Sequence, residues 1–275
     1  NTASIIGNTV KLKANKKADS TLENSGAIFA TNLVDLTAVQ DIKNTGNIYT
    51  VNQQELGAVN LTAQAIQNQS SGVISTNKLH VSADQIVNDG QISADEAIIL
   101  ANKLQKTALS NNGKASNNAG IYIYKSLQAE NLSHLNNTGD IYVNLNGSQN
   151  SSLIQTEHLN NANGAYLFLG NNLHFIQTGL VSQNAGEIYV QGNGVAPLAT
   201  SISFAKLDNT NGMLSIDAAT LDFSNNYQHT GKLNAMNSAA VNAKADFTNS
   251  STGEVNLYNS ALKTKSLTNQ NQIKT

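Results

Sequence analysis

One short phrase recurs along the chain: an apolar residue, an Asn-rich stretch, a glycine, and an apolar residue two places after the glycine. Clear copies occupy 22–28, 42–48 and 86–92. Looser copies contain Gly72, Gly113, Gly139, Gly164, Gly186, Gly212, Gly231 and Gly253. The spacing varies between about 18 and 26 residues, the range of solenoid repeats, in which stacked units bury a shared core.

Within each unit, short runs alternate apolar and polar residues, as strands with one buried face do. Ile66 ends one such run, 68–72 forms a turn, and Val73 begins the next run. We therefore predict an all-β chain, a right-handed parallel β-helix with three short strands per coil and about eleven coils. A propeller or sandwich would need blades of roughly forty residues or matched hairpins. Asn-Gly hairpin signals between matched strands are largely missing.

The composition agrees with a stacked fold. The chain has no Cys, no Trp, one Pro and 12% charged residues, yet 40% of it is hydrophobic, so its periodic apolar residues argue against disorder. Stacked Asn side chains at equivalent turns can form hydrogen bonds along the coil axis. Gly serves at corners where a Cβ atom would clash.

The repeat continues through the whole chain, so we expect a single β-helix segment over 1–275. Both ends fall in mid-repeat without a polar cap, which predicts an interior slice of a longer filament. Inserted loops are expected at 114–120, 146–152 and 191–199. The segment 93–109 also resembles a capped helix, but Gly90 and Gly113 keep it in repeat phase and favour a coil. No apolar run approaches the roughly twenty residues that span a bilayer.

The phrases LENSG at 22–26 and GQISA at 90–94 resemble the repeats of filamentous haemagglutinin-type exoproteins. These bacterial two-partner-secretion proteins include the toxin-delivery filaments of contact-dependent growth inhibition. The resemblance covers almost the whole chain from Leu22 onward, and it implies a β-helix secreted to the surface of a Gram-negative cell. No segment matches the family's secretion domain or a carboxy-terminal toxin. The resemblance therefore implies a stalk, or the receptor-binding part of a stalk.

Aromatic residues occupy outward positions in four consecutive coils. Because side chains alternate along a strand, the residue two places after the glycine points inward and the next points outward. The predicted receptor-binding residues are Tyr122, Tyr124, Tyr142, Tyr166, Phe168 and Tyr189. Exposed Tyr offers a large, stiff contact area, and the expected partner is an outer-membrane protein or surface glycan of a target cell. In the alternative interpretation the rings only fill grooves between coils.

The histidines give a weaker signal. His134 and His158 each precede a leucine that closes a coil, so we predict that they stack on one outer face. Two imidazoles lack the third ligand that a metal site needs, and no metal or cofactor is expected. We predict that the remaining histidines lie on the surface: His80, His174 and His229.

Catalytic and nucleic-acid-binding signals are weak. Asp95 and Glu96 are the only adjacent acids, and although Asp140 and Glu187 each follow a glycine, Ala165 holds that place in the coil between them. The chain has no Arg for a uronate carboxylate, so we expect no enzyme. A net charge of −2 predicts no nucleic-acid partner and no membrane insertion, and we expect a monomer. The predicted function is receptor binding by a filament, with an adhesin or passive spacer second and a polysaccharide-cleaving enzyme third.

Overall fold

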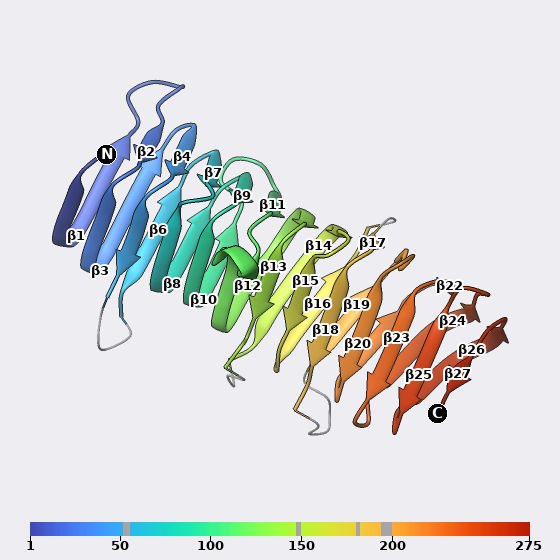
Figure 1. Ribbon diagram of the computed structural model, residues 1–275. Helices are drawn as coiled ribbons and strands as arrows, with labels where there is room; N and C mark the ends of the chain where they lie inside the picture. Colours follow the sequence, from blue (N-terminus) through green and yellow to red (C-terminus); the bar gives the residue numbers. More distant parts are fainter. Residues whose placement is uncertain (52–55, 147–149, 180–181, 194–199) are drawn as a thin grey trace.

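The computed structural model shows a parallel β-solenoid, whose strands follow one another from the amino-terminal to the carboxy-terminal end of a rod (Figure 1). It describes residues 1–51, 56–146, 150–179, 182–193 and 200–275. Over these described residues the chain makes about 12 turns and contains essentially no helix. The prediction of an all-β parallel solenoid is therefore confirmed.

Long strands run through a corner of the coil. For example, β3 pairs with β5 through 27–30 and with β6 through 33–37. The long strands are β1 (Ser4–Ala14), β3 (Ala27–Ala38), β8 (Val73–Ser82), β10 (Gln91–Leu100), β12 (Gly120–Asn137), β14 (Ser152–Asn161), β24 (Ala240–Asn249) and β26 (Ala261–Asn269). Because each corner is shared with the coils above and below, the rod keeps its shape from coil to coil.

The stack of strands that follows the glycines carries a column of large apolar residues on its inner side. Its shorter members are β5 (Asn47–Thr50), β13 (Asp140–Val143), β15 (Tyr166–Leu169), β18 (Glu187–Gln191), β20 (Met213–Asp217), β23 (Lys232–Met236), β25 (Glu254–Tyr258) and β27 (Ile273–Lys274). The inner column begins with Ile28, Ile48, Ile74, Ile92, Ile121 and Ile141, all buried. At the corner before β5, a Cβ atom on Gly46 would overlap the carbonyl oxygen of Gly26, so only glycine fits there.

The remaining strands complete the coils. Along the middle of the coil lie β6 (Ala58–Thr62), β16 (Leu173–Gln177), β19 (Ser201–Phe204) and β21 (Thr220–Phe223). The stack that leads to the glycine corner contains β2 (Leu22–Asn24), β4 (Asp41–Asn44), β7 (Ala65–Asn68), β9 (Gln85–Asn88), β11 (Thr107–Asn111), β17 (Gln183–Asn184) and β22 (Tyr227–His229). Toward the carboxy-terminal end the core changes from aliphatic to aromatic, with Phe175, Phe204, Phe223 and Phe247 buried in successive coils.

A ladder of buried asparagines runs along the rod at the end of that last stack. Each Nδ2 donates to the Oδ1 of the asparagine in the next coil, as from Asn24 to Asn44 at 2.8 Å and from Asn44 to Asn68 at 2.8 Å. The ladder continues without a break to Asn209. Each amide also donates to backbone carbonyls at the corner, so a polar group is buried at little cost. The predicted axial Asn bonds are confirmed.

His229 interrupts this ladder. It lies in register with Asn249 and is fully buried, so the prediction that it lies on the surface is wrong. Its Nε2–H donates to the carbonyl oxygen of Glu254 at 3.0 Å, while its Nδ1 lies 3.1 Å from the Tyr227 hydroxyl and accepts from it. Both imidazole nitrogens are satisfied in the neutral form, but the buried Oδ1 of Asn249 is left without a partner.

The structure tests one of the three predicted inserted loops in full, and it also tests the possible helix at 93–109. The segment 114–120 leaves the coil and contains a short 3-10 helix, η1 (Ala115–Asn117), before β12 begins at Gly120. Parts of the other two predicted loops, 147–149 and 194–199, lie outside the described residues. The segment 93–109 forms the end of β10 and the start of β11 rather than a helix, as the repeat phase predicted.

We predict that Asn111→Ala lowers the free energy of unfolding by about 3 kcal/mol, because it removes the side-chain acceptor of Asn88 Nδ2 and leaves the buried Oδ1 of Asn137 without a donor. The neighbouring Asn112 makes its bonds to Asp89 and Thr138 in exposed surroundings. Asn112→Ala is therefore a matched control that should cost no more than about 0.5 kcal/mol. Urea unfolding measures both, and equal losses would contradict a structural role for the ladder.

We also predict that the stability of the rod falls in mild acid. Burial lowers the pKa of His229 in the folded chain, whereas the unfolded chain takes up a proton near pH 6.5. The unfolded state then binds more protons, so stability is lost as the pH falls below about 6.5 and levels off below the folded pKa. His229→Asn combined with Tyr227→Phe should weaken this dependence in urea titrations at neutral and acidic pH. An unchanged pH dependence in the double variant would refute this assignment.

Candidate functional site

The predicted aromatic residues form a continuous outer surface, here called the aromatic face (Tyr122, Tyr124, Tyr142, Tyr166, Phe168 and Tyr189). Backbone register aligns Tyr122 with Tyr142, Tyr142 with Phe168, and Phe168 with Tyr189. They belong to β12, β13, β15 and β18, which are neighbours along the rod (Figure 1). All six side chains are half-buried. As the alternation of side chains predicted, Tyr122, Tyr142, Phe168 and Tyr189 form one column on four successive coils, and Tyr124 and Tyr166 lie beside it.

The rings of the column pack on one another. The ring centroids of Tyr122 and Tyr142 are 5.2 Å apart and nearly parallel at 7°, and those of Phe168 and Tyr189 are 5.8 Å apart at 12°. Tyr142 and Phe168 are 6.2 Å apart. Because the ring faces contact each other, ring edges and the tyrosine hydroxyls are what the column presents to solvent. Tyr124 lies two residues along β12 from Tyr122 and joins no ring contact among the described residues.

Carboxylates border the rings. Tyr166 lies two residues before Phe168 on the same side of β15, and it is in register with Asp140 in the preceding coil and Glu187 in the following coil. The prediction that Ala165 holds this place is wrong, because Gly164 lies in a longer turn with a φ of 73° and is not the corner residue. The hydroxyl of Tyr189 donates to Asp217 Oδ2 at 3.2 Å. Asp140, Glu187 and Asp217 therefore make this surface acidic.

Burial and these acids disfavour ionisation of the tyrosines. Burial, and then the carboxylate of Glu187, raises the pKa of Tyr166 to about 12. Burial, and then Asp217, raises the pKa of Tyr189. Burial also raises the pKa of Tyr142, with Asp140 as the second cause. The hydroxyls consequently stay protonated at neutral pH and act as hydrogen-bond donors and acceptors next to negative charge.

The loop at 114–120 packs beside the aromatic face. The backbone N–H of Ala115 donates to Asp140 Oδ2 at 2.6 Å, and the hydroxyl of Tyr122 donates to the carbonyl oxygen of Ala119 at 2.9 Å. The loop is thus joined to the tyrosine column at two points. A rigid scaffold with an attached loop is a common arrangement for recognition surfaces.

The stacked histidines are confirmed, with ring centroids of His134 and His158 4.9 Å apart. Glu157 beside them forms an ion pair with Lys106, whose hydrogen bond lowers the pKa of Glu157. His80 and His174 are exposed, as predicted. Within the described ranges no group of three or more His, Cys, Asp or Glu side chains is placed to hold a metal ion.

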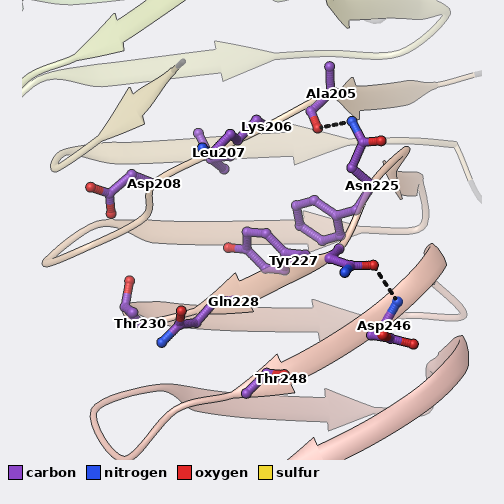
Figure 2. A pocket seen from close by; sticks show the side chains of 12 residues that line it. Ala205, Lys206, Leu207, Asp208, Asn225, Tyr227, Gln228, Thr230, Asp246 and Thr248 are labelled. Atoms are coloured by element: carbon purple, nitrogen blue, oxygen red, sulfur yellow. Dashed lines mark hydrogen bonds between the residues drawn. The ribbon is translucent and has the colours of Figure 1, made fainter. Parts of the chain in front are cut away.

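A cleft that the sequence did not predict lies near the carboxy-terminal end of the rod. It encloses about 620 Å³ between 205–208, 225–230 and 246–248, which belong to three successive coils. Figure 2 shows Lys206, Asp208, Gln228, Thr230 and Asp246 around it. One feature of the sequence could have indicated an irregular coil at this place. His229 lies two residues before Gly231, where other units have asparagine.

Comparison of the chain with protein-family models, with curated proteins and with solved structures found no match. No helix in the described part of the chain is long and apolar enough to cross a bilayer. The chemistry of the aromatic face and the cleft is therefore the basis for a functional assignment.

We predict that Tyr166 ionises near pH 12 in an ultraviolet titration and that Tyr166→Phe removes that step. Glu187→Gln should lower the pKa of Tyr166, because it removes the carboxylate charge that raises this pKa most. Since the folded pKa lies above the unfolded value of about 10, the unfolded chain loses its proton first, and stability falls as the pH rises from about 10 to about 12. Loss of a step near pH 10 in Tyr166→Phe would contradict this assignment.

Proposed function

We propose that this chain is a non-enzymatic, receptor-binding segment of a filament secreted to the surface of a Gram-negative bacterium. In this proposal the coil is right-handed with three strands per turn, and the parent filament delivers a toxin on contact with a target cell. Support comes from the parallel solenoid, from the resemblance of the LENSG-type repeats to filamentous haemagglutinin-type exoproteins, and from the aromatic face.

The observation that carries the proposal is the aromatic face itself. Tyr122, Tyr142, Phe168 and Tyr189 stack on consecutive coils and leave their ring edges partly exposed on the outer side of the rod. Tyrosines are enriched at recognition surfaces because a stiff ring loses little entropy on binding and its hydroxyl adapts to either hydrogen-bonding role. Parallel strands on both sides hold these rings in place before a partner arrives.

The surroundings of the rings indicate the chemistry of the partner. Asp140, Glu187 and Asp217 border the column, and no ion pair of Asp140, Glu187 or Asp217 is found in the described part of the chain. A partner with Lys or Arg side chains would gain charge-assisted hydrogen bonds to these carboxylates. Cations also bind favourably to aromatic rings. We therefore favour a basic loop of an outer-membrane protein over a surface glycan.

The mutual packing of the rings also suits a passive spacer, in which stacked side chains only stabilise neighbouring strands. The two functions differ in what happens when the rings are removed. A spacer loses some stability and binds nothing, whereas a receptor-binding segment loses a partner. Binding measured on matched variants therefore separates them.

We predict that replacing Tyr122, Tyr142, Phe168 and Tyr189 together by Ser abolishes binding of the chain to outer-membrane vesicles from susceptible target cells. Aromatic anchors of this kind each contribute about 2 kcal/mol or more, so the combined loss exceeds a hundredfold in affinity.

Phe29 and Tyr49 provide the control, since they occupy the same column with ring centroids 4.9 Å apart but lie outside the aromatic face. Replacing both by Ser should leave vesicle binding intact. Circular dichroism verifies that both variants fold. Binding that persists without the four rings refutes the assigned surface, and failure of the native chain to bind any vesicles favours the spacer.

A further inference from the structure

The cleft near the carboxy-terminal end exists because sheet pairing is interrupted there. One coil earlier, Asp208 N–H donates to the carbonyl oxygen of Ser182, and Asn184 N–H donates to that of Asp208, both at 2.8 Å. One coil later, Ser250 N–H donates to the carbonyl oxygen of His229 at 3.0 Å. No backbone hydrogen bond joins 207–209 to 227–229, and the structure describes all of these residues.

A change in corner length separates these two segments. Two residues lie between Phe204 and Leu207, whereas three lie between Phe223 and Tyr227, so the chain takes a wider path in the second coil. The additional length lets the rings of Phe223 and Tyr227 stack at 3.6 Å. His229 in the place of an asparagine removes the side-chain bond that would otherwise join this coil to Asn209.

The cleft is closed at both ends along the strand direction. The Nδ2 of Asn225 donates to the carbonyl oxygen of Ala205 at 2.8 Å at one end, as Figure 2 shows. The hydroxyls of Thr210 and Thr230 are 3.0 Å apart at the other end. A through-running strand of another protein therefore does not fit. The volume of about 620 Å³ lies within the range of small-molecule sites, about 300–1,000 Å³.

The walls carry hydrogen-bonding groups that the fold leaves unused. Lys206 Nζ and the side-chain amide of Gln228 have no partner among the described residues, although both side chains are exposed at the cleft. Asp208 and Asp246 each use one carboxylate oxygen, Asp208 for Thr210 and Asp246 for Ser266. The second oxygens of Asp208 and Asp246, together with Lys206 and Gln228, point to a ligand that both donates and accepts many hydrogen bonds.

The same groups exclude other ligand classes. A phosphate would meet two carboxylates and only one Lys, which disfavours it. A flat aromatic ligand would need an exposed ring to stack on, but Phe223 and Tyr227 are 2% and 4% exposed. A hydroxyl-rich molecule without charge meets neither obstacle. We propose that this cleft binds a neutral saccharide of one or two sugar units, independently of the aromatic face.

Saturation-transfer NMR on the whole chain tests this site with lactose, cellobiose and N,N′-diacetylchitobiose as neutral probes, and with glucuronic acid and glucosamine as charged ones. At least one neutral disaccharide should bind. Lys206→Ala with Gln228→Ala removes two unpartnered side chains on opposite walls, and should weaken that binding about tenfold.

Lys43→Ala with Gln67→Ala is the matched control, because it removes the same side-chain types, in register, from two coils far from the cleft. It should leave saccharide binding unchanged, and so should the Ser variant of the aromatic face, which separates this site from the proposed receptor-binding function. The proposal is overturned if no neutral probe binds, if only charged sugars bind, or if the Lys206 and Gln228 variant binds as tightly as the native chain.

Discussion

A buried amide on each coil fixes the register of this solenoid. The Nδ2 of each ladder asparagine from Asn24 to Asn184 needs an acceptor in the next coil, and the next asparagine supplies it at 2.7–3.0 Å. If a coil slipped by one residue, the ladder side chain would leave the core and its neighbours would be left unpaired, at a cost of about 1–3 kcal/mol for each group. Apolar packing alone tolerates such shifts more readily, because it has no direction.

The aromatic face depends on that register. Tyr122, Tyr142, Phe168 and Tyr189 are far apart in sequence, and they form a column only because equivalent positions of successive coils coincide. Parallel strands lie about 4.8 Å apart, which is close to the separation that aromatic rings prefer. Stacking then turns the ring faces toward each other and leaves the tyrosine hydroxyls at the outer edge, where those of Tyr122 and Tyr189 donate to Ala119 and Asp217. The stacked arrangement of the rings thus follows from the spacing of the coils, and Asp140, Glu187 and Asp217 add the negative charge beside it.

Local patterns predicted the fold and the column well, because the Asn and Gly corner and the alternation of strands are set within a few residues. His229 was misjudged because histidine suggests a surface, although its position two residues before Gly231 is that of Asn24 before Gly26. Tyr166 was misaligned because Gly164 lies in a longer turn and resembles a corner glycine only in sequence. The cleft could not be predicted, since it results from a one-residue difference between two corners that no single unit contains.

The ladder has a direction, because every amide from Asn24 to Asn184 donates toward the carboxy-terminal end. Aligned hydrogen bonds of this kind polarise and strengthen one another, so the asparagines before His229 act as one cooperative unit. The few coils after it form a second, shorter unit, with Asn249 and Asn269 as its own pair. In a one-dimensional array, the coils on one side of a weak junction can open together while those on the other side stay folded. Fraying of the carboxy-terminal coils would therefore stop at this boundary and leave the tyrosine column intact.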